Sequence, residues 1–97
     1  MANYELVFIA QPELDEEGLT SLLDKFTNMV QGLGAQVTQI EARGKRQLAY
    51  PIRKYREGYY YVVQLEAGPD VPASLNRALR LDEQIIRHLI VAKGEEE

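Results

Sequence analysis

The residues best suited to chemistry gather in one short stretch near the middle of the chain. Residues 43–56 carry six cations and two tyrosines but no acid: Arg43, Lys45, Arg46, Arg53, Lys54 and Arg56, with Tyr50 and Tyr55. Cations pair with phosphate oxygens, and arginine does so through two parallel hydrogen bonds. Tyrosine stacks on unpaired bases and offers a hydroxyl for hydrogen bonding. We call residues 43–56 the basic stretch, and its composition favours contact with RNA.

The net charge of the whole chain is -4, which taken alone disfavours a nucleic-acid partner. The acids lie elsewhere, because residues 1–42 hold seven of them against a single cation, Lys25. Salt screens charges beyond roughly 8–10 Å, so the local field of the basic stretch decides what it binds at contact. A second interpretation stays open, because cations on an edge strand can serve only to prevent aggregation.

Catalytic and metal sites are not predicted. The single histidine, His88, lacks the partner spacing of a catalytic triad or of a zinc site, and there is no cysteine. Three successive acids, Asp15, Glu16 and Glu17, could be read as metal ligands, but the preference of a helix start for negative charge explains them better. No glycine-rich phosphate loop of the usual kinds is present. We therefore expect no enzymatic activity, no metal, no cofactor and no small-molecule substrate.

The chain start lacks the pattern of a signal peptide, and no apolar run approaches the roughly 20 residues needed to cross a bilayer. These observations predict a cytoplasmic protein without a membrane partner. The length predicts one domain over residues 1–94, followed by a short, disordered acidic tail at 95–97.

Hydrophobic periodicity predicts four strands and two helices. In chain order these are strands over 4–10, 36–52 and 59–67, a helix over about 15–31 before the second strand, a short helix after Asp70, and a last strand over 85–92. Gly44 indicates a bulge in the second strand, and Pro51, which lacks an N–H, places that strand at a sheet edge. Glu57-Gly58 predicts the turn into the third strand, and Asp70 is expected to cap the second helix.

The order β-α-β-β-α-β, read as two split βαβ units, predicts an α+β ferredoxin-like fold. This fold is a four-stranded antiparallel sheet with two helices on one face. Alternation sends Phe8 and Tyr61 to the covered face. The opposite face, which no helix covers, should carry four largely apolar side chains: Val7, Ile9, Tyr60 and Val62. An uncovered apolar face predicts a surface for a partner protein. Arg87 and His88 point to opposite faces, so at most one of them joins this surface.

Five short motifs match those of one known family in order and spacing. They are Arg46-Gln47-Leu48-Ala49-Tyr50-Pro51-Ile52 followed by Lys54, and around it Tyr4-Glu5, Gly58-Tyr59-Tyr60, Glu66-Ala67 and Ile86-Arg87. Over residues 4–93 the chain thus resembles the sixth protein of the bacterial small ribosomal subunit. The first motif is specific to that family.

The resemblance implies the ferredoxin-like fold, a structural role on the ribosome and no enzymatic activity. It implies that the chain assembles with the eighteenth small-subunit protein. It also implies that the pair binds 16S ribosomal RNA in its central domain, at the platform. The basic positions of the family match Lys45, Arg46, Lys54 and Arg87 here.

We therefore predict a structural ribosomal protein with an RNA site and a protein site. We expect phosphate contacts from Lys45, Arg46, Arg53 and Lys54, and contacts to sugars or bases from Gln47 and Tyr50. Arg87 is expected to add a further RNA contact from the last strand. A second hypothesis is a ferredoxin-like regulatory module that binds a small ligand or dimerises through its sheet. An acylphosphatase-like hydrolase would need an anion-binding loop after the first strand, where residues 11–13 offer an acid instead.

Overall fold

Strands and helices follow one another in the predicted order β-α-β-β-α-β, in a computed structural model that describes residues 1–93. The elements are β1 (Ala2–Ala10), α1 (Glu16–Gly32), β2 (Gln36–Ile52), β3 (Tyr55–Ala67), α2 (Val71–Leu81) and β4 (Ile85–Ala92). The predicted acidic tail at 95–97, with Gly94, lies outside the described residues. Within the described part, neither helix is long and apolar enough to cross a membrane.

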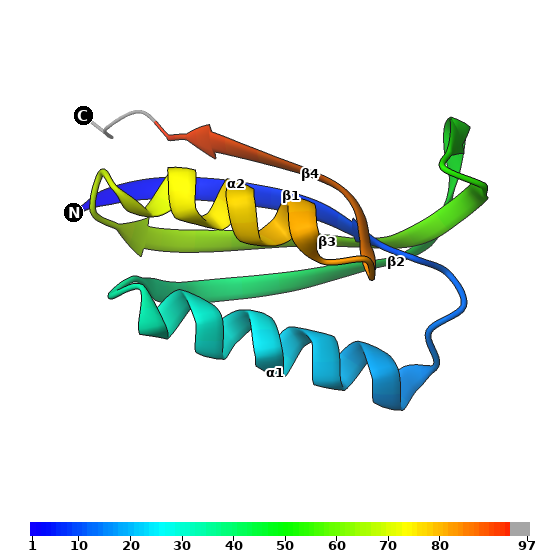
Figure 1. Ribbon diagram of the computed structural model, residues 1–97, viewed down its shortest axis with the longest axis horizontal. Helices are drawn as coiled ribbons and strands as arrows, with labels where there is room; N and C mark the ends of the chain where they lie inside the picture. Colours follow the sequence, from blue (N-terminus) through cyan, green and yellow to red (C-terminus); the bar gives the residue numbers. More distant parts are fainter. Residues whose placement is uncertain (94–97) are drawn as a thin grey trace.

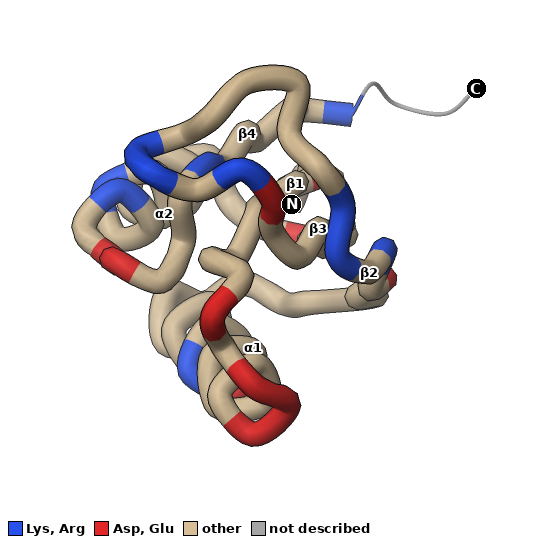
Figure 2. The backbone as a smooth tube through the Cα atoms, turned by 90° about the vertical axis from the view of Figure 1, so that its right-hand side faces the viewer, with Lys and Arg blue, Asp and Glu red and all other residues tan. Residues whose placement is uncertain are grey.

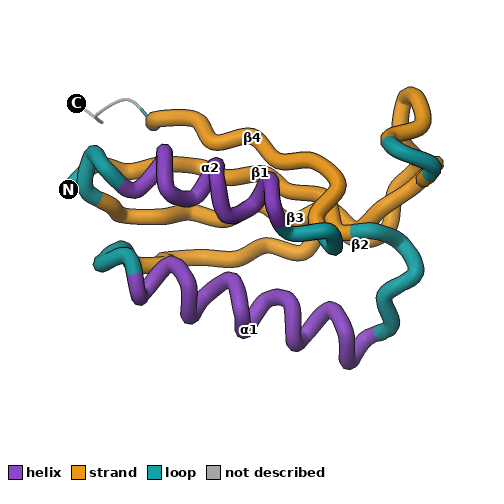
Figure 3. Tube along the Cα trace, viewed as in Figure 1, coloured by secondary structure: helices purple, strands orange, loops and turns teal. Residues whose placement is uncertain are grey.

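The four strands form one antiparallel sheet in the order β2-β3-β1-β4. This confirms the predicted ferredoxin-like topology, and it confirms that the strand containing Pro51 lies at an edge. The long hairpin of β2 and β3 bends out of the sheet at one end of the molecule, beyond the end of α2 (Figures 1 and 3). The predicted bulge is also present, because Gly44 has a positive φ of 83° and the β2–β3 register shifts between Ala42 and Gly44.

Both helices pack on one face of the sheet, where a single core forms. The strands contribute the alternating set that the sequence predicts, including Leu6, Phe8 and Tyr61, which are 0–5% exposed. Phe8 lies at the centre, with its ring 5.5 Å from that of Phe26 in α1 and 5.2 Å from that of Tyr61 in β3. Burial raises the pKa of Tyr61, with a smaller contribution from neighbouring Tyr59. Burial of this one face holds the helices and the sheet together.

Two local predictions about chain reversals and caps are wrong. Gly58 does not form the turn: it is a buried residue inside β3, and the turn lies at Arg53 and Lys54. A Cβ at Gly58 would meet Ile9 Cγ2 and lie 2.9 Å from the carbonyl oxygen of Ala10, so glycine is needed for close strand approach. Asp70 precedes α2 but its side chain makes no capping hydrogen bond. By contrast, Asp15 Oδ1 accepts a hydrogen bond from the Gly18 N–H at 2.8 Å and caps α1.

Candidate nucleic-acid and protein interface

The basic stretch lies mainly on the part of the β2–β3 hairpin that projects from the sheet. We call residues 45–58 the arm. Its turn is two residues long, because Ile52 pairs with Tyr55, and Arg53 takes the left-handed conformation with φ 57°. A non-glycine residue in that conformation costs roughly 1–2 kcal/mol, which the flanking strand pairs must offset. The turn exposes Arg53 and Lys54 at the tip of the arm.

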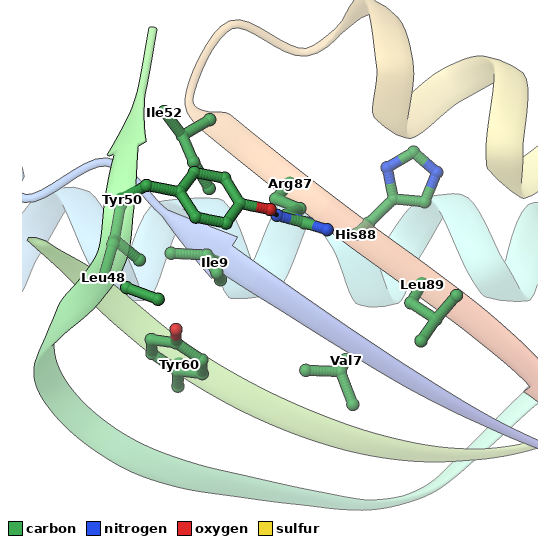
Figure 4. A pocket seen from close by; sticks show the side chains of 10 residues that line it. Val7, Ile9, Leu48, Tyr50, Ile52, Tyr60, Arg87, His88 and Leu89 are labelled. Carbon is green, nitrogen blue, oxygen red and sulfur yellow. Dashed lines mark hydrogen bonds between the residues drawn. The ribbon is translucent and has the colours of Figure 1, made fainter. Parts of the chain in front are cut away.

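One side of the arm loops out of the strand ladder. The register runs from Arg46 opposite Gly58 to Gln47 opposite Glu57, and then jumps to Ile52 opposite Tyr55. Residues 48–51 therefore have no paired residue in β3. Proline needs no partner for an N–H, so Pro51 is compatible with this break. The looped-out segment presents Tyr50 toward β4 (Figure 4).

Three of the five cations of the arm contact tyrosine rings or backbone rather than acids. Lys45 Nζ lies 5.2 Å from the centre of the Tyr59 ring, and Lys54 Nζ lies 6.0 Å from that of Tyr55. Arg46 Nε donates to the Arg43 carbonyl oxygen at 3.3 Å. In the described part of the chain, none of the five arm cations forms an ion pair with a carboxylate. Their charges are therefore free to pair with phosphates.

Arg43 differs from the other cations of the basic stretch. Its Nε lies 2.9 Å from Glu41 Oε2, so an acid two residues away on β2 already pairs with its charge. Arg43 belongs to the basic stretch but was given no predicted contact, and strand spacing puts residues 41 and 43 on one face. Arg56, likewise without a predicted contact, is exposed. Figure 2 shows basic residues along the arm and acidic residues around the start of α1.

Arg87 in β4 and Tyr50 in the arm are brought together, although 37 residues separate them. Arg87 Nη1 donates to the Tyr50 hydroxyl oxygen at 2.7 Å, and the guanidinium carbon lies 5.8 Å from the ring centre. The hydrogen bond, followed by the charge interaction with Tyr50, raises the pKa of Arg87. Both were predicted to contact RNA, but nothing in the sequence indicated that they contact each other.

The face without helices carries an apolar concavity of about 340 Å³ under the arm. Three of the four predicted partner-surface residues line it, namely Val7, Ile9 and Tyr60. Val62 does not line it; it lies further along the same face, opposite Val7. Sequence reasoning missed four apolar members: Leu48, Ala49 and Ile52 from the arm, and Leu89 from β4 (Figure 4). Alternation could have found Leu89, because it lies two residues from Arg87 and pairs with Val7.

A second concavity of about 180 Å³ lies along the looped-out segment. Gln47, Pro51 and Arg56 are among the residues that line it, and Tyr50 contributes to both concavities. Gln47 and Tyr50, which were predicted to contact sugars or bases, are both exposed there. An amide, a phenol and a guanidinium on one exposed surface offer donors, acceptors and a stacking ring together.

His88 belongs to the fold rather than to this surface. Although it borders the apolar concavity, its Nε2 lies 3.0 Å from the Asn76 side-chain oxygen in α2, on the covered side of the sheet. Burial, and then repulsion from Arg80, lowers the pKa of His88. Residues 1–93 contain no group of three potential metal ligands, and Asp15 is used as a helix cap.

Comparison with known proteins finds one family. Residues 3–92 match the model of the family described as ribosomal protein S6. The chain is 43% identical over 95 residues to small ribosomal subunit protein bS6 of Desulforamulus reducens, covering 98% of this chain and 100% of the relative. It is 43% identical over 96 residues to bS6 of Moorella thermoacetica, covering 99% and 98%.

A crystal structure of 30S ribosomal protein S6 from Thermotoga maritima superimposes with a TM-score of 0.88 at 26% identity. The superposition covers 95% of this chain and 87% of that one. The family is structural and not enzymatic, in agreement with the prediction made from the resemblance. The chain belongs to the ribosomal protein S6 (bS6) family of the small ribosomal subunit.

Proposed function

We propose that this chain binds 16S ribosomal RNA, in its central domain at the platform, together with the eighteenth small-subunit protein. In this proposal the RNA contacts come from the arm and from Arg87, and the partner protein packs on the face without helices. The observation that carries the RNA assignment is the charge of the arm. Five cations lie on one projecting hairpin, and in the described part of the chain no carboxylate pairs with them.

Chemistry divides the RNA contacts into two kinds. Cations on flexible stems reach the RNA backbone without reading sequence. The proposed phosphate contacts are therefore Lys45, Arg46, Arg53, Lys54 and Arg87. Gln47 and Tyr50 are proposed to contact sugars or bases, because an amide and a phenol hydrogen-bond base edges and tyrosine stacks on unpaired bases. Along the arm, Gln47 and Tyr50 lie between two pairs of cations, Lys45-Arg46 and Arg53-Lys54, which supports a single continuous RNA track.

The partner assignment rests on the apolar concavity and its surroundings. Leu89 is 61% exposed and Val91 48% exposed, on the same face as Val7, Ile9, Tyr60 and Val62. Exposed apolar side chains gathered on one face are typical of a protein interface. Because Tyr50 and Arg87 border this face, a bound partner would lie directly beside the RNA contacts.

Charge reversal at Arg46 tests the RNA site. We expect Arg46→Glu to weaken binding of 16S RNA by roughly 10- to 100-fold in a filter-binding titration with the partner protein present, the range for a lost charge-assisted hydrogen bond. The free energy of unfolding should change by under about 0.5 kcal/mol, because the position is exposed.

Arg77→Glu is the matched control, because it makes the same charge change at an exposed position of α2. This control should leave RNA affinity within about twofold of the parent, because Arg77 belongs to α2 and not to the arm. Equal affinities for the two variants would reject the arm as the RNA site.

Leu89→Asp tests the partner site. A carboxylate placed in an apolar interface loses its hydration, so affinity for the partner protein should fall by at least about tenfold in calorimetric titration. Leu81→Asp is the control, because Leu81 is 76% exposed at the end of α2 on the other side of the sheet. Unchanged partner affinity in Leu89→Asp would exclude this face.

A further inference from the structure

The contact between Tyr50 and Arg87 joins two parts of the molecule that the strand ladder does not join. Tyr50 lies in the looped-out part of β2 at one edge of the sheet, and Arg87 lies in β4 at the opposite edge. The contact therefore crosses the two central strands. The hydrogen bond is 2.7 Å long, and the guanidinium also lies against the ring, 5.8 Å from its centre.

The arm has few other means of holding a fixed direction. Nowhere in its 17 residues does β2 contain a buried side chain, and in the arm only Leu48 and Ile52 on that strand are half-buried. The β2–β3 ladder holds the hairpin together but does not fix its angle to the sheet, especially across the break at residues 48–51. A contact from that break to β4 does fix the angle.

The apolar concavity depends on this angle. One wall of the concavity comes from the arm, through Leu48, Ala49, Tyr50 and Ile52. The other wall comes from the sheet, through Val7, Ile9, Tyr60 and Leu89. Ile9 and Ile86 are each only 6% exposed, yet neither belongs to the core under the helices. If the arm swung outward, the concavity would become an open sheet face.

We propose that the Tyr50–Arg87 contact is a strap that holds the arm over the helix-free face and so keeps the partner surface and the basic arm in one fixed arrangement. Arg87 can form the strap and still bind a phosphate. A guanidinium has five N–H donors, and Tyr50 accepts from one of its nitrogens, so donors remain for a phosphate. A role of the strap in assembly rests on the proposed function, because that function gives both surfaces a ligand: RNA for the arm and the partner protein for the helix-free face. The strap itself is a property of the isolated chain.

A double-mutant cycle in the isolated full-length chain tests whether the two side chains act together. Tyr50→Phe keeps the ring and removes only the hydroxyl, and Arg87→Leu removes the donor. We expect the folding equilibrium constants, measured by urea denaturation, to show a coupling of roughly three- to tenfold between the two changes. A coupling factor near one would overturn the strap.

Distance measurement tests whether the contact positions the arm. The chain has no cysteine, so spin labels can be placed at Lys54→Cys on the turn of the arm and Thr20→Cys on α1. The parent should give one narrow distance distribution. Arg87→Leu should broaden it or add a second distance, and Tyr50→Phe added to Arg87→Leu should broaden it no further.

Tyr55→Phe is the matched control, because it removes a tyrosine hydroxyl from the same arm and leaves the contact between Tyr50 and Arg87 in place. It should leave the distribution unchanged. A distribution in Arg87→Leu as narrow as in the parent would overturn the strap even if the cycle showed coupling. Neither measurement contains RNA or the partner protein, so the proposed function can fail in the Arg46→Glu and Leu89→Asp titrations without altering these outcomes.

Discussion

The covered face of the sheet and the arm share strand β3 but differ in burial and in charge. Under the helices, Leu6, Phe8 and Val63 are 0% exposed and belong to the hydrophobic core. In the arm, the five cations stand in solvent or against tyrosine rings. Burial of apolar area stabilises the first region, whereas the second contributes little to the free energy of folding.

This difference explains how an acidic chain can carry a strongly basic surface, the one proposed to bind RNA. The core requires apolar residues in strict alternation, so it leaves little freedom for charge. The arm extends beyond the helices and is free of that requirement, because its residues face solvent. Mutations should therefore separate the two regions, with loss of stability from one and loss of binding from the other.

The largest effect should come from the centre of the core. Phe8→Ala removes a fully buried ring that packs against Phe26 and Tyr61, so the free energy of unfolding should fall by about 3–5 kcal/mol. Leu89→Ala, on the helix-free face, is the comparison and should cost less than about 1 kcal/mol because Leu89 is mostly exposed. Urea denaturation measures both. Similar losses of unfolding free energy in the two variants would mean that the covered face and the helix-free face contribute equally to stability.

An intermediate effect should come from Gly58, where the arm joins the sheet. Gly58→Ala introduces a Cβ that meets Ile9 Cγ2 and the Ala10 carbonyl oxygen, so we expect a loss of about 1–3 kcal/mol by overpacking. Gly68→Ala is the control, since nothing lies within 4 Å of its added Cβ. If Gly58→Ala unfolded at the same urea concentration as Gly68→Ala, the claim that Gly58 is needed for close approach of the strands would be rejected.

The smallest effect should be a pH dependence from His88. Its pKa is lowered in the folded state, mainly by burial, so the unfolded chain binds a proton more readily. The stability that comes from keeping His88 neutral is therefore present above the unfolded pKa of about 6.5 and is lost as the pH falls below it. The urea midpoint should drop between pH 7.5 and 5.5. In His88→Gln this drop should be smaller, and an equal drop would assign it to other groups.

Alternation predicted the sheet and its core because each face of β1 and β3 has one environment. The turn of the arm could not be predicted in this way. Glu57-Gly58 has the composition of a turn, yet Gly58 is there to let strands approach, and the true turn at Arg53 and Lys54 contains neither glycine nor proline. Arg53 adopts its positive φ because strand pairing on both sides imposes it.

The charged and polar residues of the candidate site were predictable one by one, but their arrangement and the apolar members Leu48, Ala49, Ile52 and Leu89 were not. Composition and resemblance identified the cations of the arm, Tyr50 and Arg87. The contact between Tyr50 and Arg87 depends on the break in register at residues 48–51 and on the bend of the hairpin. No local pattern in the sequence encodes either feature, because both follow from how the arm packs over β4 and β1.

The most direct test is cleavage of ribosomal RNA by a probe tethered to each region. An iron chelate that generates hydroxyl radicals can be attached at Ala49→Cys in the arm or at Thr20→Cys in α1, two exposed positions that carry no charge. Each labelled protein is then assembled into 30S subunits. We predict strong cleavage in the central domain of 16S RNA from Ala49 and much weaker cleavage there from Thr20. No central-domain cleavage from Ala49, or equal cleavage from both positions, would contradict the assignment of RNA binding to the arm.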